Sequence, residues 1–149
     1  RAQEGLEATL TGWVRAEALR GLKRAPEALE SVQRANVELE GAVRKDPTLR
    51  EYLAIADYEL GRTLALTDPS ADRSAARTAL NRALVLQRQL DAQNPEYAEY
   101  RLFLTKIFRE LGRLPGGDAM AREDAVHQAD ELAAELSRRD PQRWEYQGL

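Results

Sequence analysis

Apolar residues recur at spacings of three and four along most of this chain, which is the period of an amphipathic α-helix. Within residues 26–45 the apolar stripe consists of Ala28, Val32, Ala35, Leu39 and Ala42. No window alternates apolar and polar residues with a period of two, so strands are not expected. The pattern therefore predicts an all-α protein. We expect six long helices, and the start of a seventh at 141, over about 2–21, 26–45, 48–66, 70–93, 96–114 and 118–139.

Short polar residues followed by proline separate these helices. The predicted helix starts are Asp46-Pro47, Asp68-Pro69, Asn94-Pro95, Asp140-Pro141 and, after two glycines, Asp118. An Asp or Asn side chain caps free backbone N–H groups, and proline fits the first helical position, where no N–H is needed. Because the links are short, consecutive helices should be antiparallel neighbours.

One stretch is written three times, as DPTLREY at 46–52, NPEYAEY at 94–100 and DPQRWEY at 140–146. The first two copies begin 48 residues apart and the last two 46 apart. Apolar positions of the preceding helices keep the same spacings, as in Val32, Leu80 and Val126, in Ala35, Ala83 and Ala129, and in Ala42, Leu90 and Leu136. A shared register of this kind indicates an array of helical hairpins. We therefore interpret the stretch as a helix start whose tyrosine packs against the neighbouring hairpin, and not as a chemical site.

We expect one domain over 1–149, with units at about 1–45, 46–93 and 94–139 and a C-terminal cap at 140–149.

These hairpins resemble tetratricopeptide repeats over nearly the whole chain. The matching positions are Ala28-x3-Val32-x2-Ala35 and Ala76-x3-Leu80-x2-Ala83 for the second helix, and Leu60-Gly61 and Leu111-Gly112 for the first. The standard unit has about 34 residues, whereas this one is 12 to 14 residues longer. The two Leu-Gly pairs are 51 residues apart, so the loops must absorb a shift, and in the third unit Arg122 replaces the first alanine, with Ala125 as its substitute. Such elongated units resemble those attached to large bacterial signalling proteins, including serine/threonine kinases.

The resemblance implies three hairpins stacked as a right-handed superhelix. A compact closed six-helix bundle is the alternative that the same apolar pattern allows. The resemblance also implies a non-catalytic scaffold that binds a peptide or partner protein along a concave face made by the first helices. Carried onto this sequence, that face gives the candidate contact residues Tyr58, Glu59, Arg62, Lys106, Arg109, Glu110 and Arg113.

The tetrapeptide ELGR, at 59–62 and 110–113, supports a contact role for this face. A glycine inside a helix costs about 1 kcal/mol relative to alanine, so we expect another helix to come close there. Packing does not explain the repeated Glu and Arg. If Arg62, Arg109 and Arg113 share the concave surface, they should favour a carboxylate or an acidic peptide.

Two other functions remain open. The chain could form a homodimer through a terminal face and so position an attached signalling domain, with Trp13 and Trp144 near the two ends. With lower weight, it could hold a small ligand in a pocket between helices.

The composition limits the kinds of functional site that we expect in this chain. Charged residues are abundant, at 32%, but the net charge is only −3, so the chain lacks the basic surface typical of nucleic-acid binding. It has no cysteine and one histidine, His127, which argues against thiol catalysis and against a nitrogen or sulfur metal site. Its PGGD stretch at 115–118 lacks the strand and Lys-Ser/Thr pair of a phosphate loop. We expect neither enzyme activity nor a cofactor.

No apolar run is long enough to cross a membrane, and no signal peptide is present. We therefore expect a cytoplasmic location. The sequence begins with Arg1 rather than methionine, which predicts a fragment of a larger protein.

Overall fold

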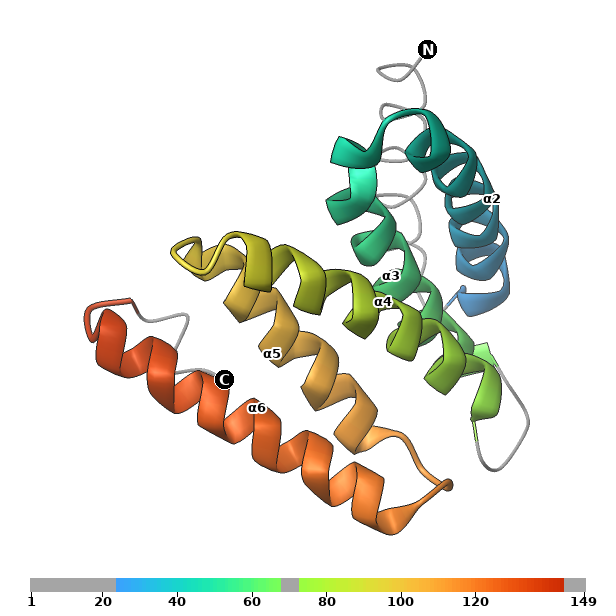
Figure 1. Ribbon diagram of the computed structural model, residues 1–149. Coiled ribbons are helices and arrows are strands. Elements are labelled where there is room, and N and C mark those ends of the chain that lie inside the picture. Colours follow the sequence, from blue (N-terminus) through green and yellow to red (C-terminus); the bar gives the residue numbers. More distant parts are fainter. Residues whose placement is uncertain (1–23, 68–72, 144–149) are drawn as a thin grey trace.

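The computed structural model describes residues 24–67 and 73–143, in which every regular element is a helix and no strand occurs (Figure 1). The all-α prediction is confirmed. The predicted helix 2–21, the helix start at Asp68-Pro69 and both tryptophans lie outside the described residues. The elements are α2 (Ala25–Lys45), a 3-10 turn η1 (Pro47–Leu49) leading into α3 (Arg50–Thr67), α4 (Ser74–Gln93), α5 (Ala98–Arg113) and α6 (Ala119–Arg139).

Each helix packs against the next one along the sequence. α2 packs on α3, α3 on α4, α4 on α5 and α5 on α6. Figure 1 shows that consecutive helices run antiparallel, as predicted. The first helices of two hairpins, α3 and α5, therefore run in the same direction.

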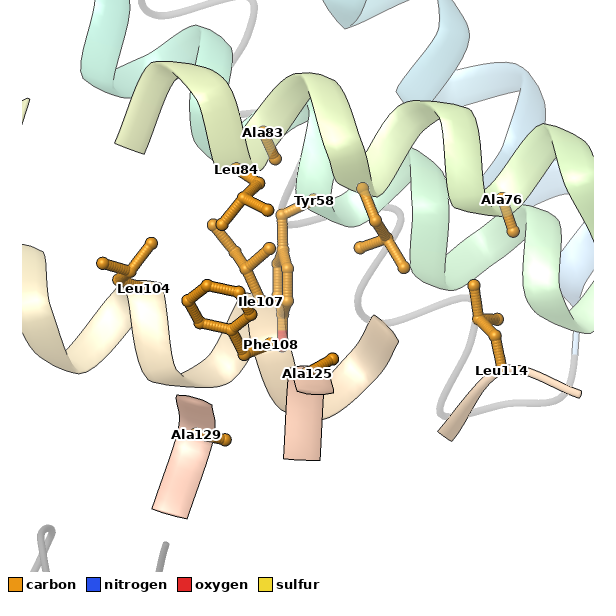
Figure 2. Close-up of a cluster of buried hydrophobic side chains, with 11 residues drawn as sticks. Tyr58, Ala76, Ala83, Leu84, Leu104, Ile107, Phe108, Leu114, Ala125 and Ala129 are labelled. Carbon is orange, nitrogen blue, oxygen red and sulfur yellow. The ribbon is translucent and has the colours of Figure 1, made fainter. Parts of the chain in front are cut away.

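The main hydrophobic core lies between the α3–α4 hairpin and the α5–α6 hairpin. Figure 2 shows Ile107 and Phe108 of α5 reaching toward Tyr58 of α3 and Leu84 of α4. The buried members of this core are Tyr58, Ala76, Leu80, Ala83, Leu84, Leu104, Ile107, Phe108, Leu114, Ala125 and Ala129. A second, smaller cluster joins α2 to the α3–α4 hairpin through Ala28, Val32, Leu60 and Ala79.

Most positions of the predicted apolar register are buried, including Ala35, Ala83 and Ala129. Ala125, the expected substitute for the missing alanine, is buried as well. Val126 departs from the register because it is 44% exposed.

Asp46 and Asp118 cap helix starts as predicted. The side chain of Asp46 accepts a hydrogen bond from the backbone N–H of Thr48 at 3.1 Å, and Asp118 does the same for Met120 at 3.0 Å. These carboxylates satisfy N–H groups that a helix start leaves without an intrahelical partner. Asp140 accepts from the N–H of Gln142 at 3.2 Å, but it ends α6. The residues that follow it as far as 143 form a turn, so the predicted helix from 141 is not seen in the described residues.

The prediction that Asn94 caps the following helix is wrong. Its side-chain amide donates to the carbonyl oxygen of Leu90 at 3.1 Å, so the residue finishes α4. The N–H of Tyr97 then donates to the Asn94 carbonyl at 3.0 Å, which closes a turn before α5 begins at Ala98. An amide can donate to a helix C-terminus, which a carboxylate cannot do. Tyr97 stands in this turn and is 52% exposed.

Both ELGR glycines lie where another helix comes close. A Cβ atom added to Gly61 would lie 2.6 Å from Cγ of Leu80 and 3.2 Å from the backbone oxygen of Ala76, both on α4. One added to Gly112 would lie 2.7 Å from Cγ2 of Val126 on α6. The close contact between α3 and α4 thus recurs between α5 and α6. This is the close approach of another helix that the two mid-helix glycines predicted.

The three-residue shift between the glycines and the caps arises at the start of α5. Gly61 stands 15 residues after Asp46, whereas Gly112 stands 18 residues after Asn94. η1 begins at Pro47, directly after Asp46, but α5 begins only at Ala98, because a turn follows Asn94.

A buried polar cluster joins α2, α3 and α4. Asp57 of α3 accepts hydrogen bonds from Nδ2 of Asn36 at 2.8 Å and from Nη2 of Arg82 at 2.9 Å. Glu40 of α2 lies 4.0 Å from the same guanidinium. Burial raises the pKa of Asp57, while the hydrogen bond from Asn36 and the charge of Arg82 oppose that rise. The cluster fixes how α2 and α4 lie across α3, since a buried carboxylate must keep both partners.

Replacing Gly61 by alanine should lower the free energy of unfolding by up to about 2 kcal/mol. Overpacking against Leu80 costs roughly 1–3 kcal/mol, and the better helix propensity of alanine returns about 1 kcal/mol. Gly41 is the matched control, because a Cβ atom there meets nothing within 4 Å, so Gly41→Ala should raise stability by up to about 1 kcal/mol. Urea unfolding measures both, and equal stabilisation by the two changes would contradict the close approach at Gly61.

Arg82→Met should lower the free energy of unfolding by about 1–3 kcal/mol, because it leaves the buried Asp57 carboxylate without its charged donor. Arg34→Met is the control. Its guanidinium pairs with Glu30 at 3.2 Å on an exposed helix face, and the loss of such a pair costs about 0.5 kcal/mol or less. If thermal or urea unfolding shows the same loss for both variants, the cluster does not hold the helices together.

Candidate functional site

A groove of about 420 Å³ lies between α3 and α5, with α4 beneath it. Its lining combines aromatic, aliphatic and charged side chains of the two first helices with one buried amide of α4. The lining residues are Glu51, Ile55, Tyr58, Glu59, Arg62, Gln87, Tyr97, Glu99, Tyr100, Leu102, Phe103 and Lys106.

Aromatic rings form two edge-to-face pairs in the groove. Tyr58 and Phe103 face each other across α3 and α5, with ring centroids 5.0 Å apart. Tyr97 and Tyr100 make a second pair at 4.6 Å. The guanidinium of Arg62 lies 5.5 Å from the centre of the Tyr58 ring, within the range of a cation–π contact. These contacts fix the rings in place and leave aromatic surface facing the groove.

At one end of the groove, Tyr100 links α5 to α3 and α4. Its hydroxyl donates to Oε2 of Glu51 at 2.6 Å, and its carbonyl oxygen accepts from Nε2 of the buried Gln87 at 3.0 Å. Glu99, at the same end, pairs with Arg143 at 2.7 Å. The tyrosine of the repeated stretch thus contacts the preceding hairpin, as predicted, but through a hydrogen bond from a partly exposed side chain.

Two groove tyrosines have altered acidity. The hydrogen bond to the Glu51 carboxylate, with burial adding to it, raises the pKa of Tyr100 to about 12 from an ordinary value of 10.0. Burial raises the pKa of Tyr58 to about 12 as well. The proton of the Tyr100 hydroxyl is thus held against Glu51 to a higher pH than in a free tyrosine.

The repeated Glu and Arg of ELGR form a chain of alternating charges. Arg62 lies 3.5 Å from Glu59 in its own helix and 4.0 Å from Glu110 in α5. Glu110 in turn lies 3.3 Å from Arg113. The Arg62–Glu110 pair connects the two copies, so the charged positions of the repeat link consecutive hairpins.

The predicted contact residues fall into three groups. Four of them line the groove, namely Tyr58, Glu59, Arg62 and Lys106. Glu110 and Arg113 adjoin its far end through Arg62.

Arg109 lies apart, because its guanidinium faces Asp130 of α6 at 3.4 Å. The expected cluster of three like charges does not form, since each of these arginines has a carboxylate beside it. Among the described residues, Lys106 is the lining cation that has no carboxylate within 4 Å.

Sequence reasoning missed the other lining residues, notably Glu51, Gln87, Tyr97 and Phe103. A signal for Glu51 was present, because Glu51 and Glu99 stand at the 48-residue spacing of the repeat, next to Tyr52 and Tyr100. We interpreted that stretch as a helix start, which gave no reason to place its side chains in the groove.

No group of three or more acidic or histidine side chains is placed to hold a metal ion in the described ranges. His127 is exposed on α6, 3.0 Å from Glu131 and outside the groove lining. No helix among the described residues is long and apolar enough to cross a membrane. In comparisons with known proteins, no family, curated protein or solved structure matches the chain.

Alkaline pH should weaken the fold through Tyr100. Its pKa is 10.0 ordinarily and about 12 in the folded chain, so between these values the folded state holds a proton that the unfolded state has lost. The contribution is fully present below pH 10 and disappears as the pH rises toward 12. Urea unfolding of the wild type and Tyr100→Phe should therefore differ most below pH 10. A difference independent of pH would show that the Glu51 hydrogen bond does not raise this pKa.

Proposed function

We propose that the chain is a non-catalytic interaction module that binds a segment of a partner protein in the α3–α5 groove. The observation that carries this proposal is the combination of exposed aromatic surface with charges that are already paired inside the groove. From the resemblance to tetratricopeptide repeats we also propose that the hairpins form a superhelical stack, and that the chain is attached to a cytoplasmic signalling protein.

The lining suits a protein ligand. Aromatic side chains supply contact area at a low cost in conformational entropy and are enriched at protein interfaces. Tyr97 presents half of its surface to solvent, and Lys106 of the lining is exposed. A volume of about 420 Å³ holds a few side chains of a bound segment.

The scaffold beneath the groove also favours binding. Its walls are helices, and Gln87 and the Arg62–Glu110 pair hold α3, α4 and α5 in a set relation. Sites carried by packed helices are better preorganised than sites carried by loops. Such a groove needs little ordering when a partner enters.

The outer face of α6 gives less support to the homodimer alternative. Apart from Met120 and Val126, its exposed side chains are mainly charged, as in Glu123, Asp124 and Glu131. Interfaces of permanent homodimers are more apolar than this.

Site-specific photo-crosslinking in an extract of the native host tests the proposed function. A photoreactive amino acid at Tyr97 or Lys106 should give adducts with a partner protein. The controls are Val37 on α2 and His127 on α6, which are exposed and lie outside the groove lining.

Adducts confined to the control positions, or none at the groove positions, would refute binding in the groove. An adduct at His127 with the mass of two copies of the chain would favour the homodimer instead.

A further inference from the structure

The two ends of the groove carry opposite charges that the chain itself leaves uncompensated. Glu51 receives a hydrogen bond from the neutral hydroxyl of Tyr100, and in the described part of the chain no lysine or arginine nitrogen lies within 4 Å of its carboxylate. Lys106 is exposed and likewise has no carboxylate within that distance among the described residues. The other charged lining residues have partners, Glu59 in Arg62 and Glu99 in Arg143.

These two charges stand at a defined separation. Tyr100 holds Glu51 beside the first turn of α5, and Lys106 follows six residues later on that helix. At 1.5 Å per residue, the separation along the helix axis is about 9 Å. Between the two ends lie the paired rings of Tyr58 and Phe103.

The negative end has a surface suited to a guanidinium. The Tyr97 ring is half exposed and packs edge-to-face on Tyr100, which holds Glu51. An arginine side chain stacks on an aromatic face and donates to a carboxylate at the same time, because its guanidinium is planar. Lysine lacks this geometry.

We propose that the occupant of the groove is an extended segment of a partner protein with an arginine, a central apolar side chain and a carboxylate. The arginine binds Glu51 and Tyr97, the apolar side chain packs on Tyr58 and Phe103, and the carboxylate pairs with Lys106. This assignment rests on the proposed function.

The occupant binds in an extended conformation. An extended chain advances about 3.3 Å per residue and directs alternate side chains to one face. The arginine, the apolar residue and the acidic residue therefore stand at the first, third and fifth positions, so that all three face the groove. The first and fifth positions lie about 13 Å apart along the chain, and the long side chains of arginine and lysine span the difference from the separation of about 9 Å.

Selection from a displayed library of random heptapeptides against the full chain tests the assignment. We expect enriched peptides to carry Arg and, four residues away, Asp or Glu, with an apolar residue midway between them. Selection against Lys106→Glu should replace the acidic position by a basic one, and selection against Glu51→Gln should remove the preference for arginine. Circular dichroism confirms that each variant is folded.

The affinity of the strongest selected peptide, measured by fluorescence anisotropy, gives the second readout. Lys106→Ala should weaken binding about two- to fivefold, the range of an exposed ion pair, and Lys45→Ala, an exposed lysine outside the groove, should not. Raising the salt concentration should reduce the difference between wild type and Lys106→Ala.

The outcomes separate the two proposals. Peptides that bind in the groove, as shown by loss of binding in Tyr97→Ala, but carry no such charge pair would overturn the arginine–carboxylate assignment and leave the groove as the binding site. No enriched peptide, or peptides whose binding ignores every groove variant, would overturn the proposed function and with it the assignment.

Discussion

The close approach of paired helices at Gly61 and Gly112 is the constraint on which the rest of this fold depends. Without a side chain at Gly61, Leu80 of α4 lies directly on the backbone of α3, and Val126 of α6 lies on α5 in the same way. In each hairpin the two helices thus come closest at a glycine, where one helix has no side chain to hold the other away. The stability lost by glycine inside a helix is offset by the apolar packing that the short distance permits.

Narrow hairpins also determine where the first helices lie. Because α4 sits close on α3, its opposite side meets α5, where Ala83 and Leu84 pack with Ile107 and Phe108. α3 and α5 then run side by side on one face, with the groove between them. The Arg62–Glu110 pair and the Tyr100–Glu51 hydrogen bond connect these two helices at different levels.

The polar contacts add specificity to a core that is rich in alanine and leucine. Small and aliphatic side chains tolerate sliding of one helix along another, whereas a buried carboxylate has few acceptable positions. Asp57 accepts hydrogen bonds from both Asn36 and Arg82, which favours the register in which α2 and α4 lie across α3. In the groove, Gln87 has a similar effect on α5.

The sequence by itself determined the features that depend on neighbouring residues. Helical period, the caps at Asp46 and Asp118, and the need for close packing at Gly61 follow from local geometry and from the cost of each residue in a helix. Only the tertiary structure decided which charged side chains meet. The helical period predicts on which face of its helix each arginine lies. It does not show that Arg62 reaches Glu110 or that Arg109 reaches Asp130. Likewise, the hydrogen bond between Tyr100 and Glu51 spans 49 residues, and it exists because the stacked hairpins bring the starts of α3 and α5 together.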